Sequence, residues 1–281
     1  NMLEIAHSLA GPETNLYNYK QKPLRRHKGV NRLIKDLKRL RAYQIKGVPL
    51  RGISPVDHHY SIENGWPKKL LTRSFNFPVF EYENPPLSPS SDGHRIKILM
   101  VGKMAQPIKR HFWLIKALQS SGIRCDLQIC GSGLDLEYDD GTRSFDHYQD
   151  LKKCALESSG ASNVRITLNE DVNFFELSAF YQNAQIFVLP SIQEEFGISV
   201  LEAMTHSCAV IVSDEVGAAR HITHGVDGLV FPTHNFNVFE QNVHRLLNDQ
   251  ALQISLQTEA KKTIDQNHGY AQFVKFIESL A

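Results

Sequence analysis

From residue 95 onward, short apolar runs alternate with longer segments in which apolar residues recur at helical spacing. The run IKILMVG (96–102) predicts a buried strand, and HFWLIKALQSSG (111–122) predicts a helix that ends at Gly122. Further strands are expected at 125–133, 164–169, 185–191 and 209–214, and further helices at 146–160, 173–184 and 197–207. Because these strands are apolar on both faces and are separated by single helices, the pattern indicates an α/β fold with a doubly wound parallel sheet.

The first 94 residues do not follow this pattern. Residues 1–46 carry 11 Lys and Arg against 3 Asp and Glu, a net charge of +8, which leaves −7 for the rest of a chain whose formal charge is +1. The polar, proline-rich stretch NPPLSPSSDG (84–93) predicts a connector. The sequence therefore predicts a first domain at residues 1–90 and a Rossmann-like domain at 91–281, with the final helix as a candidate to pack back on the first domain.

The composition, 42% hydrophobic and 22% charged in 281 residues, is typical of a globular protein. The four cysteines form no CxxC pair, so we expect reduced, buried thiols and no metal ligands. The acidic run DLEYDDG (135–141) lacks a glycine at its sixth position, unlike an EF-hand loop, and we interpret it as a solvated loop. No apolar run reaches the roughly 18 residues of a membrane span and no leader pattern opens the chain, so we expect a cytoplasmic protein.

The stretch PSIQEEFGISVLEAM (190–204) places two carboxylates close to an apolar run. Glu194 is expected in a loop that follows a strand, and Glu202 about two turns into the next helix, at the sheet edge where such folds bind ligands. Between them, Gly197 lets a ligand approach the backbone, and the N–H groups that open the helix favour an anion such as a diphosphate. Carboxylates suit hydroxyl groups, so a nucleotide sugar fits this combination. The alternative is that both glutamates are solvated surface residues.

The segment EEFGISVLEAM, followed by AVIVSDEVGAARHITHGVDGLVFP (209–232), resembles the donor-binding half of glycosyltransferase family 4. The resemblance covers roughly residues 95–275. It implies a GT-B architecture of two facing Rossmann-like domains. It also implies transfer of a sugar, with retained configuration and without a bound metal, from a nucleotide-diphosphate donor to a hydroxyl of a glycan or glycolipid, as in surface polysaccharide or lipopolysaccharide synthesis.

The resemblance also implies roles for individual residues. Glu194 would orient the donor sugar, and Glu202 would hold the ribose hydroxyls. In VGKMAQPIKRH (101–111), the ammonium groups of Lys103 and Lys109 would neutralise the diphosphate. Lys103 stands where the family usually has an arginine, which would offer a bidentate fork instead of a point charge.

Other positions complete the expected donor site. Phe196 and Ile198 flank the glycine that opens the helix, and Asn169 is a candidate to contact the base. Gly131, together with Gly133, matches the glycine turn that follows a strand in the family, and Gly102 is the glycine that follows a strand before the basic pair. No further cofactor is implied, because the nucleotide-diphosphate sugar is itself the donor substrate.

Near the amino terminus, EIAHSLAG (4–11) resembles a His-Ser-Leu element of the acceptor-side domain, which would bring His7 near the donor sugar. Starting at this element would leave only about half of the usual first domain, so the chain is expected to be incomplete on that side. The alternative to an active glycosyltransferase is therefore a nucleotide-sugar-binding module without independent turnover, or a half-enzyme that needs a partner chain to complete the first domain.

The segment NRLIKDLKRLRAY (31–43) combines apolar residues at helical spacing with flanking Lys and Arg. Such a helix can lie on an anionic membrane surface, which would place the protein at the inner face of the membrane, or it can pack its apolar stripe on the first domain. Nucleic acid is not expected as a partner, because no aromatic residues alternate with the charges as a stacking surface for bases would require.

Overall fold

The computed structural model describes residues 50–52, 71–74, 79, 95–133, 144–158, 163–194 and 196–278. The chain divides into two compact units, one formed by Asn1–Pro78 with Tyr270–Ala281 and the other by Val79–Gly269. In the first unit, β1 (Leu50–Gly52) pairs in parallel with β2 (Leu71–Ser74), and α10 spans Tyr270–Glu278. His7, the basic segment at 31–43, the connector at 84–93 and the acidic run at 135–141 lie outside the described residues.

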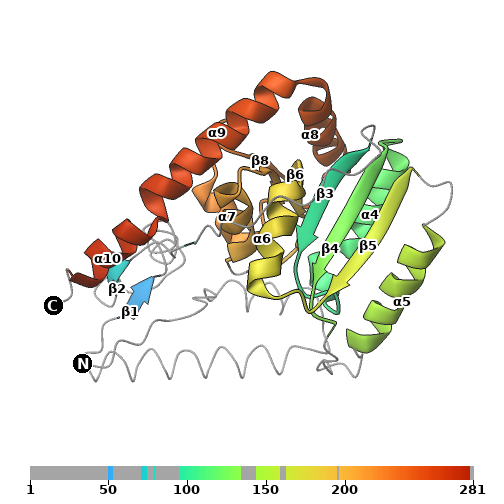
Figure 1. Cartoon of the computed structure of the whole chain (residues 1–281), viewed down its shortest axis with the longest axis horizontal. Coiled ribbons are helices and arrows are strands. Elements are labelled where there is room, and N and C mark those ends of the chain that lie inside the picture. Colours follow the sequence, from blue (N-terminus) through green and yellow to red (C-terminus); the bar gives the residue numbers. More distant parts are fainter. Residues whose placement is uncertain are drawn as a thin grey trace. The chain divides into compact units, whose positions relative to one another are not determined.

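The second unit is built on a six-stranded sheet with the order β5-β4-β3-β6-β7-β8, in which every neighbouring pair is parallel (Figure 1). The strands are β3 (Ile96–Val101), β4 (Cys125–Gly131), β5 (Val164–Glu170), β6 (Ile186–Leu189), β7 (Ala209–Ser213) and β8 (Leu229–Phe231). The chain moves outward from β3 to β5, then returns to the centre at β6 and moves outward on the other side. This order confirms the expected doubly wound sheet.

Helices connect and cover the strands. They are α4 (His111–Ser120), α5 (Ser144–Glu157), α6 (Phe174–Asn183), α7 (Ile198–Thr205), α8 (Phe236–Asn248) and α9 (Gln250–Asn267), with short 3₁₀ turns η3 (Pro107–Lys109) and η4 (Gly217–His221). Parallel crossovers are right-handed, so reversing the winding direction at β6 moves the connecting helices to the opposite face. Accordingly, α4 and α5 cover one face of the sheet and α6 and α7 the other (Figure 1).

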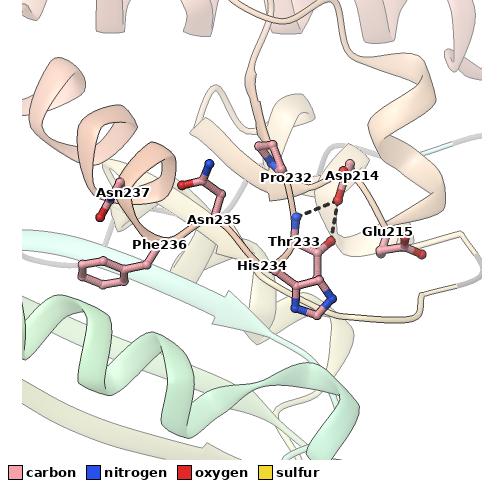
Figure 2. A pocket seen from close by; sticks show the side chains of 8 residues that line it. All are labelled: Asp214, Glu215, Pro232, Thr233, His234, Asn235, Phe236 and Asn237. Carbon is pink, nitrogen blue, oxygen red and sulfur yellow. Dashed lines mark hydrogen bonds between the residues drawn. The ribbon is translucent and has the colours of Figure 1, made fainter. Parts of the chain in front are cut away.

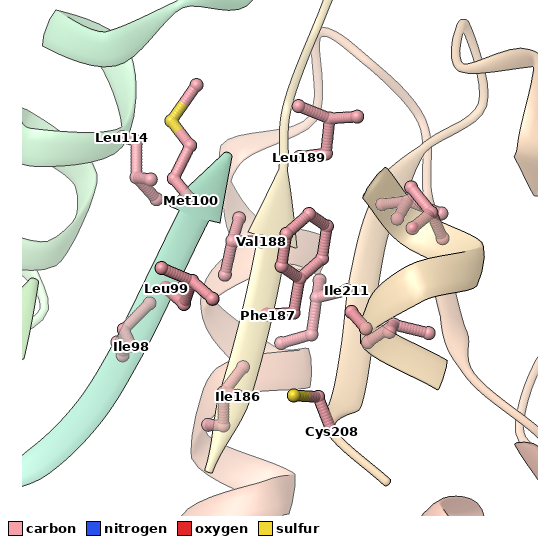
Figure 3. Close-up of a cluster of buried hydrophobic side chains, with 14 of the residues drawn as sticks. Ile98, Leu99, Met100, Leu114, Ile186, Phe187, Val188, Leu189, Cys208 and Ile211 are labelled. Carbon is pink, nitrogen blue, oxygen red and sulfur yellow. The ribbon is translucent and has the colours of Figure 1, made fainter. Parts of the chain in front are cut away.

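The core lies between the central strands and these helices (Figure 3). All four residues of β6 and all five of β7 are buried, as expected for strands covered on both faces. Phe187 and Leu114, from a strand and a helix, are both 0% exposed. Burying a side chain of this size contributes about 1.5–3 kcal/mol, so the sheet is a rigid platform for the loops at its edges.

Most boundaries predicted from the hydrophobic pattern agree with the structure. The strand expected at 125–133 ends at Gly131, and the helix expected at 146–160 is displaced to Ser144–Glu157. The cysteines are free thiols, and three are buried as expected, whereas Cys154 is only half-buried. Within the described residues, no helix is both long and apolar enough to cross a membrane.

His111, at the start of α4, predicts a pH dependence of stability. It is 0% exposed, and neither ring nitrogen has a hydrogen-bond partner among the described residues. Burial, with smaller contributions from His147 and Lys109, lowers its pKa from 6.5 to about 3. The unfolded chain therefore binds one more proton than the folded chain below pH 6.5, and the free energy of unfolding should fall by up to about 1.4 kcal/mol per pH unit as the pH drops.

Urea titrations between about pH 7 and pH 5 measure this slope, in a window above the titration of most carboxylates. The variant His111→Leu should show a shallower slope than the natural chain. Equal slopes would show that His111 is not the group that takes up the proton.

Candidate functional site

The winding of the sheet reverses between β3 and β6, which lie side by side in its centre. In open parallel sheets, ligands bind at this switch point, beyond the carboxyl ends of the strands. Two loops leave the sheet there, residues 102–110 after β3 and residues 190–197 after β6. These two loops contain most of the site residues predicted from the sequence.

Two contacts join the loops directly. The Ile192 N–H donates to the carbonyl oxygen of Ile108 at 3.0 Å. The Lys109 ammonium forms a hydrogen-bonded ion pair with the Glu194 carboxylate, and both side chains are shielded, with 11% and 19% of their surface exposed. Two expected site residues that are 85 positions apart in sequence are thus in contact.

The backbone around Glu194 is fixed on the side of β7. Its N–H donates to the carbonyl of Glu215 at 3.1 Å, and its carbonyl accepts from the N–H of Gly217 at 2.9 Å. Gly197, the N-cap of α7, has φ +79°, and a Cβ there would lie 2.7 Å from Val216 Cγ1 and 3.2 Å from Glu194 Cγ. Only glycine fits this turn without strain, so the turn holds the Glu194 side chain close to the start of the helix.

Lys109 lies in a setting that perturbs its charge. Burial lowers its pKa from 10.5 to about 8, and the neighbouring Lys103 ammonium acts in the same direction. The ion pair with Glu194 acts in the opposite direction, because an adjacent carboxylate favours the charged amine. Lys103 itself is exposed. Two ammonium groups at the end of β3 therefore form a positive region suited to an anion.

The two glycines that end β3 and β4 touch each other. A Cβ on Gly131 would lie 2.0 Å from the carbonyl oxygen of Gly102, an impossible contact with backbone. A Cβ on Gly102 would instead meet the Lys109 stem at an ordinary 3.5 Å. Gly131 thus allows the loop after β3 to pass close over the end of β4.

Glu202 lies in the second turn of α7 and is half-buried. The hydroxyl of Tyr181, from α6, donates to its Oε2 at 2.8 Å. Burial raises the pKa of Glu202, and this hydrogen bond opposes the rise. Each of the two expected carboxylates therefore has a polar partner in the protein, a lysine for Glu194 and a tyrosine for Glu202.

The remaining predicted positions are more dispersed. Phe196 packs edge-on against His221 at 5.8 Å between ring centroids, and Ile198 is 37% exposed at the start of α7. Asn169 lies at the end of β5, two strands from β3, where its amide donates to Gln128 Oε1 at 2.8 Å. Its role at the base stays a prediction, as does that of His7, which is outside the described residues.

A pocket of about 530 Å³ lies at the ends of β7 and β8, where Figure 2 shows its lining. Asp214 Oδ1 accepts a hydrogen bond from the Thr233 N–H at 2.8 Å and another from the Thr233 hydroxyl. The Asp214 carboxylate therefore joins the segments that follow β7 and β8. The Arg110 guanidinium, next to Lys109 in sequence, donates to the Thr233 carbonyl. This pocket therefore neighbours the β3 loop, although none of the site residues predicted from the sequence lines it.

Some residues at the site carried no recognisable signal in the sequence. Tyr181 precedes its partner Glu202 by 21 positions and belongs to a different helix. Ser199 donates to the carbonyl of Val101 at 3.4 Å and so ties the start of α7 to the end of β3. Such contacts depend on how α6 and α7 pack beside the sheet, which periodicity alone does not specify.

A family model matches the part of the chain that contains the parallel sheet. The model of the family described as glycosyl transferases group 1 matches residues 87–263, more than half of the chain. This range includes all six strands of the parallel sheet and both loops at its switch point.

Similar sequences include the N,N'-diacetylbacillosaminyl-diphospho-undecaprenol alpha-1,3-N-acetylgalactosaminyltransferase of Campylobacter jejuni, 40% identical over 79 residues, which are 28% of this chain and 21% of that protein. A D-inositol 3-phosphate glycosyltransferase of Arthrobacter sp. is 27% identical over 242 residues, 83% of this chain and 52% of that protein. The chain thus spans about half, or less, of the length of these two relatives.

Solved structures with a similar fold include the sucrose-phosphate synthase of Thermosynechococcus elongatus, with a TM-score of 0.65, 21% identity, and coverage of 82% of this chain and 57% of that one. The Anabaena protein Alr3699/HepE, solved in complex with UDP and glucose, gives a TM-score of 0.63 at 16% identity, over 82% and 63% of the two chains. At these identities the likeness shows the fold. The family match over residues 87–263 shows more: the chain belongs to the glycosyl transferases of group 1.

Proposed function

We propose that the chain binds a nucleotide-diphosphate sugar at the switch point of its sheet and transfers the sugar to a hydroxyl of a glycan or glycolipid. The observation that carries the proposal is the contact of Lys109 with Glu194 across the two loops that leave β3 and β6. A cation for the diphosphate and an acceptor for sugar hydroxyls thereby stand together where such sheets bind ligands.

The chemistry expected here is stabilisation of a departing diphosphate. As the bond between sugar and phosphate breaks, negative charge grows on the phosphate oxygens, and preorganised positive groups lower the barrier. Lys109 and Lys103 supply two such charges beside the end of β3. The first backbone hydrogen bond of α7 runs from the Val200 N–H to the Gly197 carbonyl, so the N–H groups of Ile198 and Ser199 have no acceptor within the helix and add a partial positive charge.

The carboxylates would act on hydroxyl groups. Glu194, fixed through its backbone on both sides, would accept hydrogen bonds from the donor sugar once the diphosphate engages Lys109. Glu202 would accept from the ribose hydroxyls, and Asn169 would contact the base. Phe196 and Ile198 would flank the ligand at the start of the helix.

We extend the proposal to finer features on the grounds of family resemblance. These features are membership of glycosyltransferase family 4 within the GT-B enzymes, retention of the configuration of the sugar, and catalysis without a bound metal. Relatives named as a capsular polysaccharide biosynthesis glycosyltransferase and an O-antigen chain mannosyltransferase favour a glycan or glycolipid acceptor. The basic sequence at residues 31–43 favours a peripheral position at the inner face of the membrane. Among the described residues, no group of three or more His, Cys, Asp or Glu side chains could hold a metal ion.

A thermal-shift screen of nucleoside diphosphates and their sugars tests the donor site. A ligand that binds only the folded chain raises the melting temperature with its concentration. The variant Glu202→Ala should lose the shift produced by the best ligand. Glu259→Ala, which removes a half-buried glutamate paired with Lys262 on α9, should keep it. An unchanged shift in Glu202→Ala would count against this site.

A second candidate is favoured because every expected site residue that the structure describes lies in the second unit, Val79–Gly269. This unit would then bind the donor without turnover by itself, or would turn it over only beside a partner chain. Measuring release of the nucleoside diphosphate from the best donor, with and without candidate acceptors, separates these two cases. Binding without release favours the second candidate.

A further inference from the structure

A fully enclosed tyrosine lies behind one of the expected ligand-binding carboxylates. Tyr181 is 2% exposed, and its hydroxyl donates to Glu202 Oε2 at 2.8 Å. Burial and the adjacent carboxylate hold the pKa of Tyr181 well above 10, so the hydroxyl stays protonated and remains a donor. Within the described part of the chain, the other oxygen, Oε1, has no hydrogen-bond partner.

The tyrosine ring is itself held in place. It stacks on the ring of His206 at 5.3 Å, with 20° between the planes, and the Tyr181 carbonyl accepts from Cys208 Sγ at 3.1 Å. His206 Nδ1 lies 2.8 Å from the Glu202 carbonyl oxygen, and since a carbonyl only accepts, Nδ1 carries the proton. The other ring nitrogen lies 2.8 Å from Ser178 Oγ.

This cluster constrains both the backbone and the carboxylate of Glu202. His206 ties the Glu202 carbonyl, while Tyr181 occupies one side-chain oxygen and fixes the plane of the carboxylate. Burial alone would favour the neutral acid, but the Tyr181 hydrogen bond favours the charged form, which is the better acceptor.

We infer that Tyr181 is a positioning residue for donor binding. Its hydroxyl keeps the Glu202 carboxylate charged and oriented, so that Glu202 Oε1 can accept hydrogen bonds from the ribose hydroxyls of the nucleotide. The inference rests on the proposed function, because it assigns the ribose to Glu202. It goes further because it makes recognition of the ribose by Glu202 depend on the Tyr181 hydroxyl, which lies on another helix and would not itself touch the ligand.

The variant Tyr181→Phe tests this, since it removes one oxygen and keeps the ring that stacks on His206. Because this hydrogen bond lies within the protein and acts on the ligand only through the Glu202 carboxylate, its loss should weaken binding of uridine or guanosine 5′-diphosphate by about three- to tenfold, less than the loss of a direct charged hydrogen bond. One of the two deoxy forms, 2′-deoxy or 3′-deoxy, lacks the hydroxyl that donates to Glu202. The affinity for that form should be weakened less by Tyr181→Phe than the affinity for the ribose form. The ratio of the affinity for the ribose form to the affinity for that deoxy form should therefore be smaller in Tyr181→Phe than in the natural chain. Isothermal titration measures all of these affinities.

Two further variants sharpen the test. Ser158→Ala removes a buried hydroxyl that donates to the Ala155 carbonyl and lies outside this cluster, and it should keep the ribose preference. If Tyr181 acts through Glu202, then Tyr181→Phe combined with Glu202→Gln should bind no more weakly than Glu202→Gln alone.

The outcomes separate this inference from the proposed function. If the natural chain binds no nucleoside diphosphate, the proposed function fails. If the natural chain binds but Tyr181→Phe weakens ribose and deoxyribose forms equally, or leaves both unchanged, only the role of Tyr181 is overturned. Additive losses in the double variant would overturn it as well.

Discussion

Replacing Gly131 by alanine is expected to destabilise the second unit by at least about 3 kcal/mol, the upper range for overpacked sites. The added Cβ would lie 2.0 Å from the carbonyl oxygen of Gly102. Unlike the end of a flexible side chain, this oxygen belongs to the backbone at the end of β3 and cannot turn aside. Relief of the clash would require β3 and β4 to separate where the candidate site begins. Urea unfolding followed by circular dichroism measures the loss.

Gly102→Ala provides the matched control, because it adds the same methyl group to the opposite side of this contact. Its Cβ would meet Lys109 Cδ at 3.5 Å, an ordinary contact with a movable side chain. We expect it to change the free energy of unfolding by less than about 1 kcal/mol, because alanine at a glycine position whose conformation it can adopt stabilises by about 0.4–1 kcal/mol. If Gly131→Ala proves as stable as Gly102→Ala, then Gly131 does not lie in close contact with the Gly102 carbonyl oxygen as the structure has it.

Replacing Lys109 by methionine is expected to have the largest effect on function. Methionine keeps most of the stem that lies against Gly102 but removes the ammonium. Losing a charged hydrogen bond to the diphosphate should weaken nucleoside diphosphate binding about 10- to 100-fold. The loss of charge stabilisation at the departing phosphate should lower turnover by a further factor on the order of 100. Titration calorimetry and steady-state release of the nucleoside diphosphate give the two numbers.

The control for Lys109→Met is Lys116→Met, which removes an exposed lysine from α4. It should leave both the affinity and the turnover close to those of the natural chain. A Lys109→Met variant that binds and turns over normally would mean that the diphosphate does not lie at the end of β3. Stability should be measured in parallel, because Glu194 loses its partner in this variant.

The fold was predictable to the extent that its strands are buried on both faces. Strand β6 is apolar throughout and β7 is apolar up to its last residue, Ser213, so their positions could be identified from the pattern alone. By contrast, β8 has only three residues, Leu229–Phe231, too few for a recognisable alternation. The helices α8 and α9 follow the last strand that the pattern identified, and they were not predicted individually.

The candidate site was predictable only in part, because its contacts join distant segments. The motif around Glu194 and Glu202 indicated a ligand, but the contact of Glu194 with Lys109 arises from the adjacency of β3 and β6 in the sheet order. The steric reason for Gly131 arises from the parallel register of β4 with β3, which places it beside Gly102. Local pattern does not encode such register, so the sequence could name these residues but not their partners.

We place the donor site of this group 1 glycosyl transferase at the switch point between β3 and β6. A crystal structure of the chain with the nucleoside diphosphate that binds best in the thermal-shift screen tests this claim most directly. We expect phosphate oxygens within hydrogen-bond distance of the Lys109 ammonium and of the Ile198 and Ser199 N–H groups, with the ribose at Glu202. A nucleotide bound elsewhere, with the Lys109–Glu194 ion pair intact and no ligand atom near the start of α7, would show that the switch point is not the donor site.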